Sequence, residues 1–286
     1  MNGEYEKELL EDIESSGFPL EIDAANQLIE KGWSVIPQFP YLDERTKKIH
    51  TVDFVAYYIT KEELNYTSFP RLVVECKTTR PEKNRPWIFH STHNPLEKIK
   101  EMPEGKGIDL LTMSAIPSNF VSLLQGYIDY ENLQSFSFPQ EIFDIITQSH
   151  FFDNSVPRAY SCYVAFLKQN DEDSPNLFRK AVYQVKGACL DLAKAFPKWP
   201  ILATIVYNGD IYEYRRDLEP KLKPCKHLLY WTLELLSEDL KPQLHSIPPF
   251  VIDIVNDAYF SDYLELLKKD FGILMQVKEA LKRVKP

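Results

Sequence analysis

The chain has 286 residues, which is enough for one elaborated domain or for two small ones. Apolar residues make up 44% of it, aromatic residues 13% and charged residues 26%, which excludes disordered, collagen-like and coiled-coil proteins. The net charge of −9 argues against a protein that coats nucleic acid through bulk charge, although a local basic site is compatible with it.

Several broad classes are excluded by the absence of their motifs. The four cysteines have no CxxC spacing and the N-terminus is acidic, so we expect no secretory leader, reduced thiols and a cytoplasmic location. The longest uncharged stretch, 110–128, is too polar to cross a bilayer, and no membrane association is expected. Sequences of the type GxxxxGK[ST], GxGxxG, HExxH and GxSxG do not occur.

The first third of the chain predicts two helices followed by three strands. The helices cover 4–13 and 19–31, ending at glycines, and the strands cover 33–39, 50–59 and 72–77, the first two as a hairpin. The apolar positions expected to form the helical faces are Tyr5, Leu9 and Ile13 in the first helix and Ile22, Ala25 and Ile29, as a buried stripe, in the second.

The remainder predicts more strands of the same sheet and two long helices. A proline-rich segment, 95–157, is interpreted as an insertion with helices near 119–129 and 139–148. Residues 208–286 are interpreted as a C-terminal extension of sheet and helix, so the chain is predicted to be a single α/β domain over 1–286. The other expected elements are strands at 160–167, 227–235 and 250–255, a helix at 177–196 with Val182, Val185, Cys189, Leu192 and Phe196 on one face, a helix from about 260, and a hairpin of 201–207 with 211–215 in which Asn208-Gly209 takes positive φ at both positions.

The third strand contains the most informative chemistry. Alternation places Glu75 and Lys77 on one face of it and Val74 and Cys76 on the other, toward the core. Asp53 lies inside the preceding apolar strand, where a carboxylate is costly unless it is paired or binds a cation. If the strands are adjacent, Asp53, Glu75 and the Cys76 backbone carbonyl form an oxygen site suited to Mg²⁺ or Mn²⁺. Lys77 would then orient a water molecule and offset phosphate charge.

A purely structural interpretation stays open at this point. The ExK pattern is weak alone, because 104–106 and 219–221 also match it, but those two lie in glycine- or proline-marked loops. Glu75 and Lys77 could form a simple ion pair, with Asp53 a satisfied carboxylate.

The order of a helix with Glu21, a strand with Asp53 and the run Val73-Val74-Glu75-Cys76-Lys77 resembles the PD-(D/E)xK phosphodiesterase superfamily, the restriction-endonuclease-like fold. The run Glu75-Cys76-Lys77 with a nearby Trp87 is similar to uncharacterised restriction-endonuclease-like proteins. The resemblance covers about 17–90 and extends more weakly through Gln184 and the 208–209 turn. It implies a central mixed sheet flanked by helices, Asp53 and Glu75 as metal ligands, Lys77 as the water-positioning residue and Glu21 as a further carboxylate near the metal.

Two departures from the family pattern bear on individual residues. Val52 stands where a proline often precedes the aspartate, and Ala188 stands where some nuclease families have a tyrosine four residues after the glutamine, which weakens a catalytic role for Gln184. Gln184 shares a helix face with the small Ala181 and Ala188 and is equally interpretable as a surface residue. Glu21 is equally interpretable as a favourable first-turn charge against the helix dipole.

A local basic segment accompanies the proposed metal site. Residues 71–100 contain seven Lys or Arg and three acidic residues. Their net charge is therefore +4, compared with −13 for the rest of the chain. The alternative is an ordinary charged loop in which the aromatic residues cover the sheet. His90 and His93 have no third partner at zinc-ligand spacing, so no zinc site is expected there. The candidate substrate-binding residues are Arg80, Lys83, Arg85, Trp87 and His90, which combine phosphate-binding charge with stacking surface.

These patterns favour a Mg²⁺- or Mn²⁺-dependent endonuclease that hydrolyses phosphodiester bonds, with DNA favoured over RNA as the partner and a homo-oligomer left open. The alternative is a catalytically silent module of the same fold that binds nucleic acid or protein, which the acidic net charge favours. A third interpretation makes the charged strand residues structural and places the active site within 95–157, where no catalytic set is recognisable.

Overall fold

The computed structural model describes residues 3–43, 46–58, 70–79, 85–91, 108–109, 137–138, 140–153, 155–164, 174–196, 201–216, 220–232 and 250–284. The helices are α1 (Gly3–Ser15), α2 (Phe18–Glu30), α5 (Gln140–Ile146), α6 (Ser174–Ala195) and α7 (Phe260–Val284), with 3-10 turns η5 (His150–Phe152) and η7 (Asp257–Tyr259). The strands are β1 (Trp33–Asp43), β2 (Lys48–Tyr58), β3 (Arg71–Lys77), β4 (Trp87–Ser91), β5 (Ile108–Asp109), β6 (Ser137–Phe138), β7 (Arg158–Val164), β8 (Ile201–Tyr207), β9 (Ile211–Arg216), β10 (Pro220–Pro224), β11 (His227–Thr232) and β12 (Phe250–Asn256).

In the described part of the chain, ten strands form one mixed sheet in the order β1-β2-β3-β8-β12-β11-β7-β4-β9-β10. β3, β8 and β12 are parallel neighbours at its centre, and the pairs β1–β2, β2–β3, β11–β12, β4–β7 and β9–β10 are antiparallel. The short pair β5–β6 is separate. The prediction of an α/β protein with a mixed sheet flanked by helices is confirmed.

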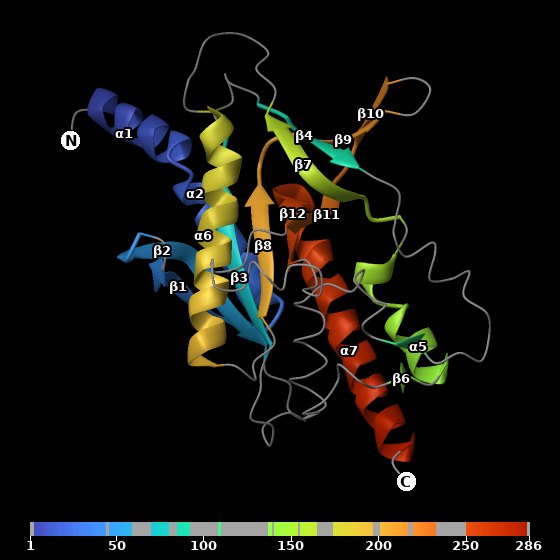
Figure 1. The fold of residues 1–286 in the computed structure, drawn as a ribbon. Coiled ribbons are helices and arrows are strands. Elements are labelled where there is room, and N and C mark those ends of the chain that lie inside the picture. The colour runs from blue at the N-terminus through green and yellow to red at the C-terminus, as the bar shows by residue number, and fades with distance from the viewer. Residues whose placement is uncertain are drawn as a thin grey trace.

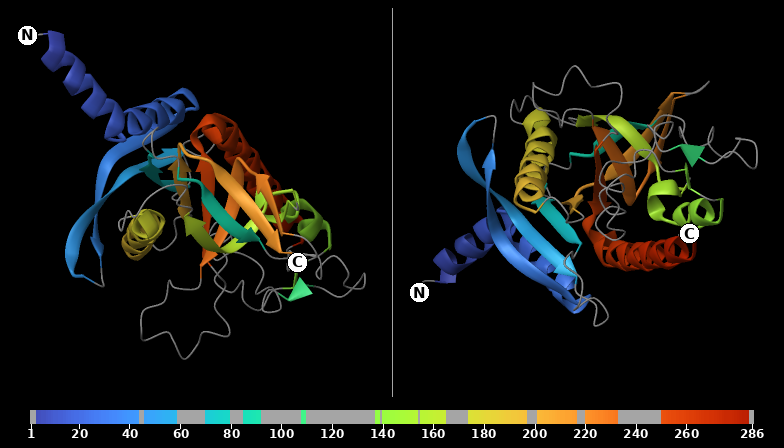
Figure 2. Two further views of the ribbon diagram at one scale, coloured as in Figure 1. Left: turned by 90° about the horizontal axis from the view of Figure 1, so that it is seen from above. Right: turned by 60° about the horizontal axis from the view of Figure 1, so that its bottom comes forward.

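Helices cover both faces of this sheet (Figures 1 and 2). α6 lies against β1, β2, β3 and β8 on one face, while α2 and α7 lie on the other. β8 is buried at all seven positions because it has a strand on each side and a helix over each face. No helix in the described ranges combines the length and the apolarity that crossing a bilayer requires.

The early helices form as expected, but the faces they bury differ from the prediction. α2 buries Leu20, Ala24 and Leu28, whereas Ile22 and Ile29 of the predicted stripe are 44% and 59% exposed. Both sets have helical spacing, and the face chosen is the one toward β1, β3 and α7. In α1, the apolar residues Tyr5, Leu9 and Ile13 are exposed, and the helix projects from the body of the molecule (Figure 1).

The predicted hairpin of 201–215 is wrong. β8 pairs with β3 and β12, and β9 pairs with β4 and β10, so the two strands flanking Asn208-Gly209 separate. Neither residue has a positive φ. Gly209 is required for a different reason: a Cβ there would lie 2.5 Å from the Tyr207 ring. The partners of a fully buried strand are set by long-range packing, which overrides the local turn signal.

The remaining predictions have mixed outcomes. The hairpin of β1 and β2, strand β3, helix α6, strands β7, β11 and β12, and helices α5 and α7 form close to the expected positions. On α6, Phe196 is 37% exposed although Val182, Val185, Cys189 and Leu192 are buried. β4 was not predicted. The predicted helix at 119–129 lies outside the described residues. Ile142, Ile146 and Phe151, within the segment interpreted as an insertion, belong to the core.

We expect Gly187→Ala and Gly272→Ala, both in helices, to have opposite effects. A Cβ at Gly187 would overlap the buried Tyr41 ring, so this change should lower the free energy of unfolding by about 1–3 kcal/mol. A Cβ at Gly272 meets nothing within 4 Å, so alanine there should raise it by about 0.5–1 kcal/mol through helix propensity. Urea denaturation of both variants measures the difference, and equal effects would contradict the described packing of α6 on β1.

Candidate active site

Asp53 and Glu75 lie on neighbouring antiparallel strands, β2 and β3. Phe54 pairs with Val74, which places Asp53 opposite Glu75. The Asp53 N–H donates to Glu75 Oε2 at 3.3 Å, and the Cys76 N–H donates to Asp53 Oδ2 at 2.7 Å. The backbone of each strand therefore holds the carboxylate of the other. The structure brings together the two acids that the sequence placed in separate strands.

Lys77 completes this group from the same face of β3 as Glu75. Its Nζ donates to Glu75 Oε1 in a close ion pair. The Glu75 side chain is 1% exposed, whereas that of Lys77 is 14% exposed. The lysine is therefore the more accessible member of the pair, and the glutamate is buried beneath it.

Glu21 approaches the same group from α2. Burial raises its pKa, the Asp53 charge raises it further and the Lys77 charge lowers it. The start of α2 lies close to the residue that follows β3, since Gly17 has a φ of 88° and a Cβ there would lie 3.0 Å from Thr78 Cγ2. The first turn of α2 therefore carries Glu21 toward the strand end that bears Lys77.

The carboxylates of this group are destabilised in their ionised forms. Burial raises the pKa of Glu75 to about 7, with Lys77 lowering it and Asp53 raising it. Burial also raises the pKa of Asp53, which the Cys76 N–H and Lys77 lower in part. Acids that repel one another in a poorly solvated site are typical of a place where a cation binds.

Neither Gln184 nor Trp87 of the basic segment bonds to the carboxylates of this site. Gln184 donates from Nε2 to the Thr51 carbonyl at 3.3 Å, so it holds β2 two residues before Asp53 rather than bonding to a carboxylate. The Trp87 ring is fully buried and stacks on Tyr207 with centroids 3.8 Å apart, so it is a core side chain. Arg85 is half-buried and His90 is exposed on β4. Arg80 and Lys83 lie outside the described residues.

Gln38 is a site residue that the sequence did not reveal. It stands opposite Asp53 in the β1–β2 register, and its Nε2 donates to Glu21 Oε2 at 3.3 Å. Its φ of 48° lies in the left-handed region, which costs a non-glycine residue about 1–3 kcal/mol. Val52 and Val55 pack in the same core cluster, although strict alternation would place them on opposite faces. The hairpin is therefore irregular beside Asp53.

The turn after β8 also holds the site. Asn208 donates its N–H to the Lys77 carbonyl at 3.3 Å, accepts from the Thr79 N–H at 2.7 Å and donates from Nδ2 to Thr78 Oγ1 at 2.7 Å. The chain after Lys77 is therefore fixed by a residue from a distant part of the sequence. The Asn-Gly pair was the signal, but it marks a clamp instead of a hairpin turn.

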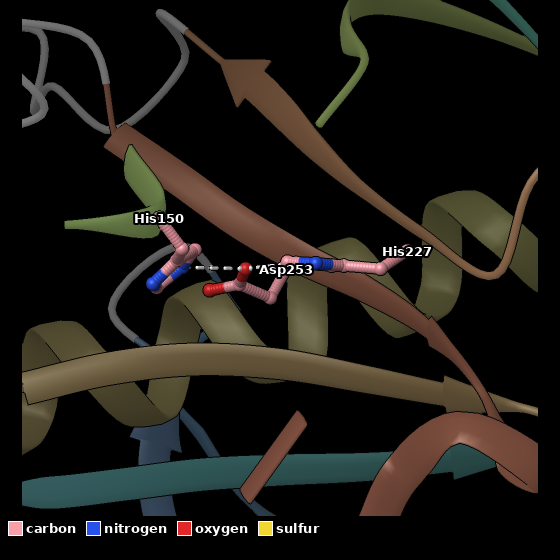
Figure 3. A group of neighbouring side chains, drawn as sticks. All are labelled: His150, His227 and Asp253. Carbon is pink, nitrogen blue, oxygen red and sulfur yellow. Dashed lines mark hydrogen bonds and ion pairs between the residues drawn. The ribbon is translucent and has the colours of Figure 1, made fainter. Parts of the chain in front are cut away.

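A second polar cluster, His150, His227, Asp253 and Asp270, is buried in the core. Figure 3 shows the first three of these residues, and Asp270 belongs to α7. Burial lowers the pKa of His150, but the charges of Asp270 and Asp253 outweigh it and raise that pKa to about 10. Burial raises the pKa of Asp253, and His150 and His227 reverse the effect and lower it. The sequence does contain a signal for Asp253, which lies inside an apolar strand as Asp53 does.

Comparison of the chain with family models, with curated protein sequences and with solved structures finds no match.

The raised pKa of Glu75 predicts how the stability of the metal-free protein varies with pH. Because this pKa is about 7 in the folded chain and 4.5 for an unperturbed glutamate, the contribution of Glu75 is complete below about pH 4.5 and is lost as pH rises through about 7. The loss should approach about 3 kcal/mol. Urea denaturation from pH 5 to pH 8 should show a smaller decline for Glu75→Gln than for wild type. The control Glu30→Gln, at an exposed position, should follow wild type; identical profiles for all three proteins would contradict the assignment.

Proposed function

We propose that the protein is a Mg²⁺- or Mn²⁺-dependent nuclease that hydrolyses phosphodiester bonds at the site of Asp53, Glu75, Lys77 and Glu21. The observation that carries this proposal is the pairing of Asp53 with Glu75 across two strands, with Lys77 at their surface side. This is the set of residues that the resemblance to PD-(D/E)xK enzymes implies. The restriction-endonuclease-like fold is part of the same proposal.

The residues present fit a hard divalent cation. Asp53 and Glu75 supply carboxylate oxygens, which Mg²⁺ and Mn²⁺ prefer, and the Cys76 carbonyl is the third ligand that we assign. Glu21 adds negative charge next to Asp53. A bound cation would offset the burial that mainly raises the pKa values of these acids, and it would supply Lewis-acid stabilisation of the charge that develops on a phosphate.

The chain's own residues would divide the remaining work. The Cys76 N–H and the Asp53 N–H fix the two carboxylates, so neither has to reorganise during the reaction. Lys77 would exchange part of its ion pair with Glu75 for contacts with the attacking water and the phosphate. Asn208 holds the backbone that follows Lys77 and so limits the range of that side chain.

One specific observation favours the alternative of a catalytically silent binding module. The site is already satisfied internally, because Glu75 accepts from Lys77 and from the Asp53 N–H, and Asp53 accepts from the Cys76 N–H. An ion pair that is never exchanged for a ligand would hold the strands together without chemistry. Such a module would bind nucleic acid or protein and would not cleave it.

We expect the wild-type protein to cleave DNA in the presence of Mg²⁺ or Mn²⁺ and to be inactive with a chelator. Lys77→Ala and Asp53→Asn should each lower the cleavage rate by at least ~100-fold, because they remove water positioning and a metal ligand. Lys221→Ala, at an exposed position on β10, is the matched lysine control and should keep the wild-type rate. Duplex DNA, single-stranded DNA and RNA should be assayed in parallel by gel electrophoresis.

Two outcomes would contradict this proposal. Cleavage that survives in Lys77→Ala would place the chemistry elsewhere in the chain. Binding of nucleic acid by wild type without cleavage of any of the three substrates, under either metal, would favour the silent module.

A further inference from the structure

The buried cluster of His150, His227, Asp253 and Asp270 is separate from the proposed nuclease site. Its residues come from η5, β11, β12 and α7, and each is at most 7% exposed. Asp253 pairs with Thr204 and Thr204 pairs with Val74, so the cluster lies two strands, roughly 10 Å, from β3. It occupies the sheet face covered by α7, the opposite face from α6.

Three side chains of this cluster converge as metal ligands do. His150 Nε2 lies 3.1 Å and His227 Nε2 lies 2.6 Å from Asp253 Oδ1. Figure 3 shows the two imidazoles approaching the carboxylate from opposite sides. One ligand atom from each residue lies within 4.8 Å of the other two. Imidazole nitrogen with a carboxylate oxygen is a donor set that suits Zn²⁺ and related transition metals and does not favour Mg²⁺.

The positions of these residues follow from the sheet and leave little freedom for them to separate. Leu229 pairs with Asp253 and His227 pairs with Val255, so His227 and Asp253 are diagonal neighbours across β11 and β12. His150 is brought to them by η5, which Ser149 caps by accepting from the Phe151 N–H. The strand register and the capped η5 turn therefore bring residues that are far apart in the sequence to ligand distance of one another.

Asp270 has the position of an outer-shell partner. Its Oδ2 bonds to the ring nitrogen Nδ1 of His150, and its Oδ1 accepts from the backbone N–H of His150 at 3.2 Å. The carboxylate therefore fixes the orientation of the imidazole and leaves Nε2 directed at Asp253. Metal-bound histidines commonly have their second ring nitrogen held by a carboxylate in this way.

The charge and hydrogen bonding of the cluster also favour an ion. The cluster contains two buried carboxylates and two imidazoles. With both imidazoles neutral, one divalent cation brings its net charge to zero, which lowers the cost of burying it. Asp253 Oδ2 is buried and, in the described part of the chain, has no hydrogen-bond partner within 3.5 Å, although the Tyr263 hydroxyl, which bonds to Thr204 Oγ1 at 2.8 Å, lies near this carboxylate. A buried carboxylate oxygen left in that state is costly, and coordination would satisfy it.

We propose that His150, His227 and Asp253 bind a structural Zn²⁺ ion, with both Asp253 oxygens as ligands and Asp270 as the positioning residue. The side chains of His150 and Asp253 have no solvent exposure, so the ion has no route to a substrate and its role is to join η5, β11, β12 and α7. Binding free energy at such a site adds to folding free energy. The proposal does not depend on the nuclease assignment.

The first test uses the wild-type chain alone. Elemental analysis after extensive dialysis should find zinc in a stoichiometric amount. The protein should then be unfolded with a chelator and refolded with Co²⁺, which should give visible ligand-field absorption of a four-coordinate nitrogen and oxygen site. Wild-type protein that folds normally with no stoichiometric metal and no Co²⁺ spectrum would overturn the proposal and leave a metal-free ion-pair cluster.

Variants then assign the site. His227→Gln should lose the zinc, while His90→Gln, at an exposed histidine, and Asp53→Asn, at the nuclease site, should retain it. Asp270→Asn should keep the ion but lower the zinc affinity by about 10–100-fold in competition with a chelating dye, a readout that a loss of packing alone would not produce. Zinc that is lost in Asp53→Asn and kept in His227→Gln would place the ion at the nuclease site and would contradict the proposal. Should His227→Gln fail to fold, the wild-type measurements decide.

Discussion

The burial of the Glu75 carboxylate is the constraint on which the centre of this structure depends. A carboxyl group this deeply buried, on a strand whose other inner positions are apolar, requires partners for both oxygens. The Asp53 N–H and Lys77 supply them, and the Cys76 N–H in turn fixes Asp53. The antiparallel register of β2 and β3 is therefore set by polar contacts as well as by the alternation of apolar residues.

The rest of the sheet is arranged so that this group sits at the junction of several elements. β3 is parallel to β8, and Lys77 pairs with Tyr207, which precedes the Asn208 clamp. α2 brings Glu21 to one side, and α6 brings Gln184 to the backbone of β2. The buried histidine cluster is built on β11 and β12, farther along the same sheet. One sheet thus supports two polar centres with different chemistry, one partly exposed and one closed.

What the sequence predicts well is local. The hairpin of β1 and β2 and strand β3 follow from runs of β-branched and aromatic residues, and the pairing of Asp53 with Glu75 follows once those strands are adjacent. The choice between two apolar faces of α2 does not follow, because Leu20 and Ile22 are equally apolar and only contact with β1 and α7 distinguishes them. The predicted pairing of β8 with β9 is wrong for a related reason: the partners of both strands are set by contacts distant in the sequence and not by the Asn208-Gly209 turn.

The residues that were missed share a non-local origin. Gln38 enters the site through an unusual backbone angle, which no residue pattern indicates. His150 and Asp253 are 103 positions apart, and only the sheet order with η5 joins them. An acid inside an apolar strand marks both centres, at Asp53 in β2 and at Asp253 in β12. A buried acid in a strand indicates that it has a polar partner or a bound cation, but the sequence does not show which residue that partner is.

The central claim is that Asp53 and Glu75 form a centre for a hard divalent cation. Calorimetric titration of Mn²⁺ into wild type, Asp53→Asn and His227→Gln, each after extensive dialysis, tests it without any assumption about substrate. The account predicts saturable Mn²⁺ binding to wild type and to His227→Gln, and its loss in Asp53→Asn. Mn²⁺ binding of equal strength in wild type and Asp53→Asn would contradict the account, because the cation would then be held elsewhere in the chain.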